Sequence, residues 1–345
     1  MRLSNYRQFL LAGIAILVLP AFCILDIRET KSFKRFQITG LAQGTSYAIT
    51  YYAGFESVRK SQIDSIFGQL DHSLSIYTPN SIISRFNASD SGVDIDDHFY
   101  NVVRKSQEIF KETEGAFDIT VYPLVRAWGF GNERVSAIPD SAEIQSLMPC
   151  IGSEKLHLSH SRLTKDLPCI KIDVNGIAQG YSVDVMANFL ESNGISNYLV
   201  EIGGEIRVKG KKYPENTAMS IGIEKPAENE FQAAGIRQVI QVPDGAVTTS
   251  GSYRNFRKLG SRRISHIINP KTGYPASTEI ISATVIADDA ITADGYDNAL
   301  LLMGLDHAME FLKKRKNLHA YFIFQKPDST IADTTTAEFS KFLKP

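Results

Sequence analysis

The side chains best suited to chemistry lie in two segments of the C-terminal half of the chain. His266 precedes an Asn-Pro-Lys-Thr-Gly turn, which would hold its imidazole beside a loop. An imidazole in that setting can take or give a proton near neutral pH. Asp294 and Asn298 are four residues apart where a helix is expected to begin, so they share one helix face. Two oxygen ligands on one face suit a hard cation such as Mg²⁺, which also contacts substrate phosphates.

The second segment allows two other interpretations. Asp288 and Thr292 have the same four-residue spacing, one helical turn earlier. Acidic residues in the first turn of a helix also commonly offset the helix dipole without binding a ligand. The sequence therefore leaves open which pair, if either, binds a metal.

Further segments combine glycines with groups that suit an anionic or aromatic ligand. Residues 173–184, DVNGIAQGYSVD, are typical of a strand end, a glycine loop and a helix start, where backbone N–H groups can meet a phosphate. They match neither Walker A nor GxGxxG. In residues 115–131, a glycine turn, an aromatic ring and a carboxylate could hold a planar heteroaromatic ring. Residues 248–255 offer hydroxyls and Arg254 to a phosphate or ribose, whereas residues 201–205 fit an ordinary hairpin with exposed acids equally well.

The composition is that of a folded globular protein. The chain has 345 residues, a formal net charge of −1 and 43% hydrophobic residues. This balance excludes disorder as the main state and argues against a broad basic surface for nucleic acid. The length permits one large or two ordinary domains. Of the three cysteines, Cys150 and Cys169 could pair in an oxidising compartment, although we expect buried thiols.

The N-terminus predicts export or membrane anchoring. Two arginines precede an uncharged apolar run over residues 9–25, which is the layout of a secretory signal or an N-terminal anchor; a buried core helix is the alternative. The positive end should stay in the cytoplasm, so the body would lie outside it. Lipidation at Cys23 is disfavoured because Phe22 precedes it, where processing needs a small side chain. We expect a signal or anchor over residues 1–28 and one domain over residues 33–345.

Hydrophobic periodicity predicts an α/β body with strands and helices mixed along the chain. Expected strands span residues 32–38, 45–52, 155–158, 170–174, 198–202, 205–209, 219–223, 237–242, 246–249, 282–287 and 320–324. Expected helices span residues 61–70, 99–113, 178–192, 292–304 and 307–314, and another begins near residue 141. Residues 327–336 are polar and are expected to form a tail.

Taken in order along residues 34–324, the motifs resemble the ApbE family, the FAD:protein FMN transferases. The resemblance rests on GTSYAITYY, SIYTPNSIISRFN, GAFDITVYPLVRAWGFG, DVNGIAQGYSVD, EIGGE, TTSGSYRNF, HIINPKTGYP and TADGYDNALLLMG. It implies an α/β (α+β) fold of the T-fold kind with two closely packed lobes. It also implies an exported or membrane-tethered enzyme that uses Mg²⁺ to split FAD at its pyrophosphate and releases AMP. The FMN half would join a threonine or serine hydroxyl of a partner protein through a phosphodiester bond.

The resemblance also assigns roles to individual residues. The residues that would contact FAD are Tyr77, Ala116, Phe117, Asp118, Asp173, Gln179 and Ile268. The metal ligands would be the backbone oxygen of Gly176 and the side chains of Asp294 and Asn298. The catalytic base for the acceptor hydroxyl would be His266 or Asp294, and the sequence does not choose between them.

Two positions depart from the family pattern. The usual lysine of the FAD loop is Gln179 here, which leaves charge neutralisation to Mg²⁺ and Arg254. The usual second side-chain ligand, threonine, is Asn298, whose amide oxygen is still an acceptable hard ligand. Two alternatives stay open: an FAD pyrophosphatase that releases FMN and AMP, and a non-catalytic exported FAD-binding protein. The resemblance points to a subunit of a membrane redox complex as the acceptor and, in a Gram-negative cell, to the periplasmic face of the inner membrane.

Overall fold

The computed structural model describes residues 33–131, 138–226, 235–251, 256–259 and 262–344. From Phe33 onward the chain forms one compact unit. The predicted signal or anchor, Cys23 and Arg254 lie outside the described residues. Within the described part, none of the helices combines the length and the apolar character needed to cross a membrane.

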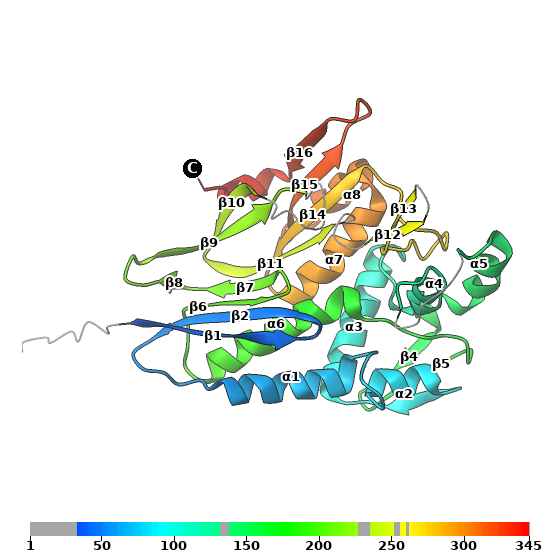
Figure 1. Ribbon diagram of the computed structural model, residues 1–345, viewed down its shortest axis with the longest axis horizontal. Helices are drawn as coiled ribbons and strands as arrows, with labels where there is room; N and C mark the ends of the chain where they lie inside the picture. Colours follow the sequence, from blue (N-terminus) through cyan, green and yellow to red (C-terminus); the bar gives the residue numbers. More distant parts are fainter. Residues whose placement is uncertain (1–32, 132–137, 227–234, 252–255, 260–261, 345) are drawn as a thin grey trace, which may run out of the picture. The chain divides into compact units, whose positions relative to one another are not determined.

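An antiparallel sheet of eight strands forms the centre of the fold (Figure 1). Its strand order is β1-β2-β6-β7-β11-β14-β15-β16, and every neighbouring pair is antiparallel. The strands are β1 (Lys34–Ala42), β2 (Thr45–Ala53), β6 (Tyr198–Ile202), β7 (Glu205–Lys209), β11 (Asp244–Gly251), β14 (Ile280–Ala287), β15 (His319–Gln325) and β16 (Ile331–Thr335).

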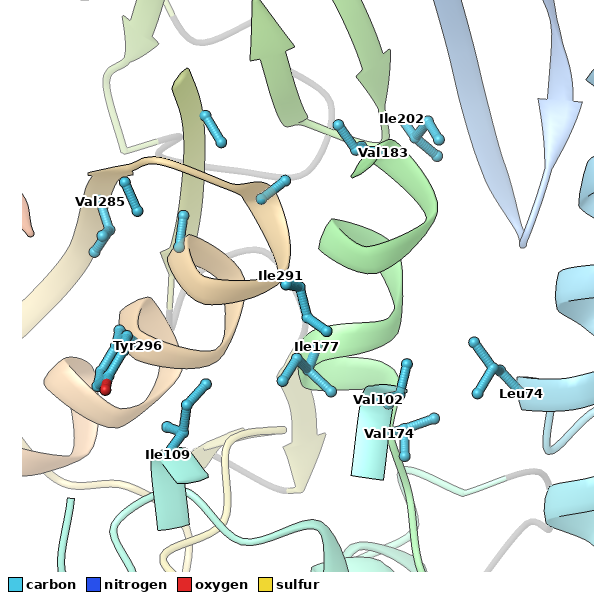
Figure 2. Packing of buried hydrophobic residues seen from close by; sticks show 14 of the residues in the cluster. Leu74, Val102, Ile109, Val174, Ile177, Val183, Ile202, Val285, Ile291 and Tyr296 are labelled. Atoms are coloured by element: carbon cyan, nitrogen blue, oxygen red, sulfur yellow. The ribbon is translucent and has the colours of Figure 1, made fainter. Parts of the chain in front are cut away.

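One face of this sheet is covered by the helices α6 (Asn175–Ser192) and α7 (Ala290–Met303). Alternate residues of each strand point to that face, and the tyrosines of β2 at positions 47 and 51 are buried there. Figure 2 shows Ile177 of α6 and Ile291 of α7 lying between the two helices. The same apolar core therefore fixes both helices that carry the predicted metal ligands.

The opposite face is covered by a smaller sheet with the order β10-β9-β8 and by the 3₁₀ helix η4 (Ala337–Phe342). In β9, Met219, Ile221 and Ile223 alternate with exposed residues and pack in a second apolar cluster. The large sheet is thus buried on both faces. The strands of the smaller sheet are β8 (Lys211–Lys212), β9 (Thr217–Glu224) and β10 (Ile236–Val242).

Several of the remaining elements pack against α6 or α7. The helices are α1 (Lys60–Leu74), α2 (Ile82–Ala88), α3 (Asp97–Glu112), α4 (Tyr122–Ala127), α5 (Ser141–Leu147) and α8 (Leu305–Lys313), with the short helices η1 (Ile119–Val121), η2 (Met148–Cys150) and η3 (Ser153–Lys155). A small sheet has the order β3 (Gly92–Asp94), β5 (Arg162–Lys165) and β4 (Leu156–Leu158), and β12 (Phe256–Leu259) pairs with β13 (Arg262–Ser265).

The predicted mixture of helices and strands is confirmed, but two segments were predicted wrongly. Residues 170–174 are irregular rather than a strand, because side chains satisfy their backbone: Asn87 bonds both the N–H and the C=O of Ile172, and Lys165 Nζ donates to the C=O of Ile170. The polar tail contains β16, an edge strand whose polar side chains face solvent while its backbone pairs with β15.

Cys150 and Cys169 form a disulfide, with their Cα atoms 5.5 Å apart. The expectation of two buried thiols was therefore wrong; the alternative that they pair is the correct one. The bond joins the end of η2 to the loop that leads into residues 170–174. It therefore fixes the chain just before the polar glycine loop.

Candidate functional site

The two helices that carry the predicted metal ligands approach each other most closely at Gly180 of α6. The N–H of Gly180 donates to Asp294 Oδ2 of α7 at 2.8 Å. A Cβ atom at position 180 would lie 2.7 Å from the Cβ of Asp294 and would also collide with the backbone oxygen of Ala290. Glycine at this position is therefore what allows the Asp294 carboxylate to reach the backbone of α6.

The first turn of α6 meets α7 through Gly176. The backbone oxygen of Gly176 accepts from Asn298 Nδ2 at 3.3 Å. The same nitrogen donates to the backbone oxygen of Asp294 and to Asp297 Oδ1, both at 3.0 Å. The structure thus brings the three predicted metal residues together, with the nitrogen end of the Asn298 amide turned toward the oxygens.

The rival pair lies elsewhere. Asp288 is exposed before the start of α7, and the N–H of Thr292 is capped by Asp289 Oδ1 at 2.9 Å. The geometry therefore favours Asp294 over Asp288 as the acidic residue of the site.

Two buried carboxyl groups, those of Asp294 and Asp297, lie in this region. Asp294 is 4% exposed and Asp297 is fully buried. Burial raises the pKa of Asp294, and the nearby Asp184 raises it further, while the Gly180 N–H lowers it. Burial also raises the pKa of Asp297 well above its usual value, and the charge of Asp294 adds to this effect. Both groups would ionise more readily beside a cation.

A further acidic residue, Asp184, positions α7. Its carboxylate accepts from the N–H groups of Ala290 at 2.9 Å and Ile291 at 2.8 Å, and from Arg207 Nη1 at 2.7 Å. It therefore joins α6, β7 and the beginning of α7. Asp184 is the last residue of the glycine segment, and the sequence predicts no role for it; its spacing of four from Gly180 is the local signal that places both on one helix face.

The predicted flavin segment lies against the glycine loop. The ring of Phe117 lies 3.6 Å from the position of a Cβ on Gly176. The backbone oxygen of Ile119 accepts from the N–H of Asp173 at 2.8 Å. Ala116, half-buried, donates its N–H to a backbone oxygen at the end of α3. These contacts place the segment beside the first turn of α6.

Asp118 of this segment is turned inward. It is 7% exposed, and Thr120 and Ser153 each donate a backbone N–H and a hydroxyl to its carboxylate. In this structure Asp118 fixes the loop that carries Phe117, and its predicted contact with FAD stays a prediction. No local pattern indicates Ser153 as a partner of Asp118, because it lies 35 residues away along the chain.

Tyr77 and Asp173 both contact Asn175, the first residue of α6. Tyr77 is 62% exposed, and its hydroxyl meets the side chain of Asn175. Asp173 accepts from the N–H of Asn175 at 2.8 Å, and burial raises the pKa of this carboxyl to about 6. An exposed ring beside a helix start can stack on a flat ligand whose phosphates meet that helix start.

Gln179 contacts the EIGGE turn. Its Nε2 atom donates to the backbone oxygen of Ile202 at 3.1 Å and lies against Gly203, where a Cβ would collide with it. Gly203 has φ = +63°, so the turn needs glycine for its backbone as well. The residue that stands in place of the family's lysine therefore attaches α6 to the turn between β6 and β7.

The segment of His266 packs against the predicted flavin segment. The His266 ring is half-buried and meets Phe130 edge-on, with ring centroids 6.3 Å apart. Ile268 is 4% exposed and packs in the apolar cluster around Leu124 and Trp128, whose indole N–H donates to the backbone oxygen of residue 273. Ile268 thus supports the segment through its side chain, and a contact with FAD would use its backbone.

The donor set fits a hard cation. It consists of oxygens, the backbone oxygen of Gly176 and the carboxylate of Asp294, with the carboxyl group of Asp297 nearby. Among the residues that the structure describes, no three His, Cys, Asp or Glu side chains converge as a metal cluster. Mg²⁺ does not need such a cluster, because it commonly binds one or two carboxylates together with substrate phosphates and water.

Gly180→Ala is expected to lower the free energy of unfolding by about 1–3 kcal/mol, because the added methyl group forces α6 and α7 apart. Urea denaturation measures the change. Gly68→Ala in α1 is the matched control: its Cβ would meet open space, so it should be neutral or stabilising by up to about 1 kcal/mol. Equal stability of the Gly180→Ala protein and the wild type would contradict the close approach.

Comparisons with known proteins agree on one family. The sequence model of the ApbE family matches residues 43–322. A protein of Vibrio cholerae named FAD:protein FMN transferase is 34% identical over 340 residues, which cover 96% of this chain and 98% of that protein. The protein of the same name from Escherichia coli K12 is 34% identical over 317 residues, with 89% and 88% covered.

Solved structures give the same result. The flavin transferase ApbE from Vibrio cholerae superimposes with a TM-score of 0.81 at 34% identity, covering 90% of this chain and all of that one. The flavinyl transferase ApbE of Pseudomonas stutzeri in its apo form has a TM-score of 0.80 at 30% identity, with 90% and 97% covered. This chain is therefore similar to these proteins in both sequence and fold.

Proposed function

This chain belongs to the ApbE family, and from that premise we propose that it transfers the FMN part of FAD to a hydroxyl group of a partner protein. The names of its relatives, FAD:protein FMN transferase, support this reaction class. The observation that carries the proposal in this chain is the convergence of Gly176, Asp294 and Phe117 at the first turn of α6.

The residues of the site have separate tasks. Phe117 and Tyr77 would hold the isoalloxazine ring, and the N–H groups at the start of α6 would face the pyrophosphate. Gly176, Asp294 and one further oxygen ligand would hold Mg²⁺. When bound, Mg²⁺ would supply positive charge that offsets the negative charge on the pyrophosphate. Asp184 would keep α7, and with it Asp294, in place.

The reaction breaks the phosphoanhydride bond of FAD and forms a phosphodiester bond to the acceptor. The oxygen of an acceptor threonine or serine attacks the phosphorus of the FMN half, and the bond to the bridging oxygen breaks, so that AMP leaves with the electron pair. The hydroxyl proton goes to a base, because a threonine hydroxyl is a poor nucleophile. His266 and Asp294 are the candidate bases. A carboxylate that binds a metal is a weak free base, which favours His266.

The setting of the reaction is part of the proposal. An apolar run over residues 9–25, which follows two arginines, supports export and membrane association. The disulfide between Cys150 and Cys169 agrees with an oxidising compartment. We therefore place the enzyme in the cell envelope, with a flavin-bearing subunit of a membrane redox complex as the acceptor.

Product analysis tests the reaction. The full-length protein is incubated with FAD, Mg²⁺ and a threonine-bearing acceptor peptide, and the products are separated by chromatography with fluorescence detection. Flavin fluorescence that migrates with the peptide supports the transferase. FMN and AMP beside unmodified peptide would instead show a pyrophosphatase, and bound but intact FAD would show a binding protein.

A further inference from the structure

Among the described residues, two buried oxygens beside the site lack a hydrogen bond of regular geometry, Asp297 Oδ2 and Thr248 Oγ1. Both residues are fully buried. The hydroxyls of Thr248 and Ser250 on β11 lie close to the Asp297 carboxyl and oppose the rise in its pKa, so they are its nearby polar groups. A buried carboxylate oxygen without a regular hydrogen bond is rare, and Asp297 Oδ2 therefore keeps the capacity to coordinate a ligand.

These oxygens belong to the same cluster as the predicted metal ligands. A single atom, Asn298 Nδ2, lies 3.0 Å from Asp297 Oδ1 and 3.3 Å from the backbone oxygen of Gly176. Asp294 precedes Asp297 by three residues, so the two carboxyl groups lie on adjacent positions of one helix face. Their charges interact, since Asp294 disfavours the ionised form of Asp297.

The amide of Asn298 does not fill the role of the missing ligand. Its nitrogen end faces three acceptors, the backbone oxygens of Gly176 and Asp294 and Asp297 Oδ1, and this arrangement fixes the orientation of the amide. An N–H group cannot coordinate a cation. The residue at the position of the family's threonine therefore acts as a donor here, whereas Oδ2 of its neighbour, Asp297, has ligating capacity left over.

We propose that Asp297 supplies the second carboxylate of the cation site in this chain, so that a divalent cation binds the protein before FAD arrives. The proposal rests on the proposed function for its choice of cation. Two buried carboxylates together neutralise a divalent cation, whereas a single carboxylate would leave part of that charge to the substrate pyrophosphate. Binding the cation also removes the repulsion between Asp294 and Asp297.

Calorimetry without FAD tests the proposal. The full-length protein, stripped of flavin, is titrated with Mg²⁺ and separately with Mn²⁺. Wild type is expected to bind one equivalent, and Asp297→Asn is expected to bind about 10- to 100-fold more weakly. Asp288→Asn, an exposed carboxylate just before the same helix, is the matched control and should bind as wild type does. Equal affinity of Asp297→Asn and wild type, or the absence of cation binding to wild type, would overturn the proposal.

Thermal denaturation separates this role from a structural one. Mg²⁺ should raise the melting temperature of wild type and of Asp288→Asn, but have a much smaller effect on Asp297→Asn. Without Mg²⁺, the Asp297→Asn protein should melt no earlier than wild type, because asparagine keeps the size of aspartate and cannot carry the charge that burial and Asp294 disfavour. Early melting without Mg²⁺, together with an unchanged Mg²⁺ response, would show that Asp297 only supports packing. Neither measurement depends on flavin transfer, so failure here is distinct from failure of the proposed function.

Discussion

Asp294→Ala is expected to lower the rate of FMN transfer by about 10³-fold or more and to abolish its response to Mg²⁺. The side chain is buried between α6 and α7, and its carboxylate is fixed by the N–H of Gly180 beside the backbone oxygen of Gly176. Removing it leaves the cation with neutral oxygens and one remaining carboxylate. The transfer rate at increasing Mg²⁺ concentrations measures the effect.

The control for this prediction is Asp288→Ala. Asp288 is exposed, lies just before the same helix and belongs to the rival pair with Thr292. It should retain the wild-type rate and the wild-type Mg²⁺ response. If the transfer rate of the Asp294→Ala enzyme still rises with Mg²⁺, Asp294 is not a metal ligand. Loss of the Mg²⁺ response in Asp288→Ala would instead favour the pair of Asp288 and Thr292.

His266→Ala is expected to lower transfer by about 10²- to 10⁴-fold while FAD still binds. The imidazole is half-buried against Phe130. Its segment packs beside the predicted flavin segment, since the Cε atom of Lys271 lies 3.8 Å from the position that a Cβ on Gly115 would take. As the proposed base, it would take the proton of the acceptor hydroxyl rather than hold the flavin. Single-turnover transfer and FAD titration by flavin fluorescence separate the two effects.

A surface histidine provides the comparison. His160 is exposed, with its ring 3.8 Å from the carboxylate of Asp97, and His160→Ala should leave both transfer and FAD binding unchanged. Full activity of His266→Ala would remove this residue from the mechanism and leave Asp294 as the candidate base. Loss of FAD binding in the same variant would show that His266 holds the substrate.

The features that the sequence predicted best depend on short-range geometry. The four-residue spacing of Asp294 and Asn298 fixes a shared helix face wherever the helix packs, and the structure indeed brings both to Gly176. The alternation of β2 and β9 likewise follows from the period of two in a strand. The order of the motifs added the family, which no single motif could have given.

The features that the sequence missed depend on partners far along the chain. Asp118 is turned inward by Ser153, and Asp184 caps the beginning of α7, more than a hundred residues away. The orientation of the Asn298 amide depends on Gly176 in another helix. Residues 170–174 have the composition of a strand, but the Asn87 side chain takes the place of a neighbouring strand. Local pattern cannot reveal such contacts, because each is set by the packing of the whole unit.

The most direct test of the central claim is mass spectrometry of the acceptor after reaction with FAD and Mg²⁺. The account predicts that the acceptor gains the mass of one FMN ester at a threonine or serine, with one AMP released for each acceptor modified. An acceptor in which that residue is alanine should stay unmodified. AMP release at the same rate with both acceptors, and no flavin on either, would contradict the account.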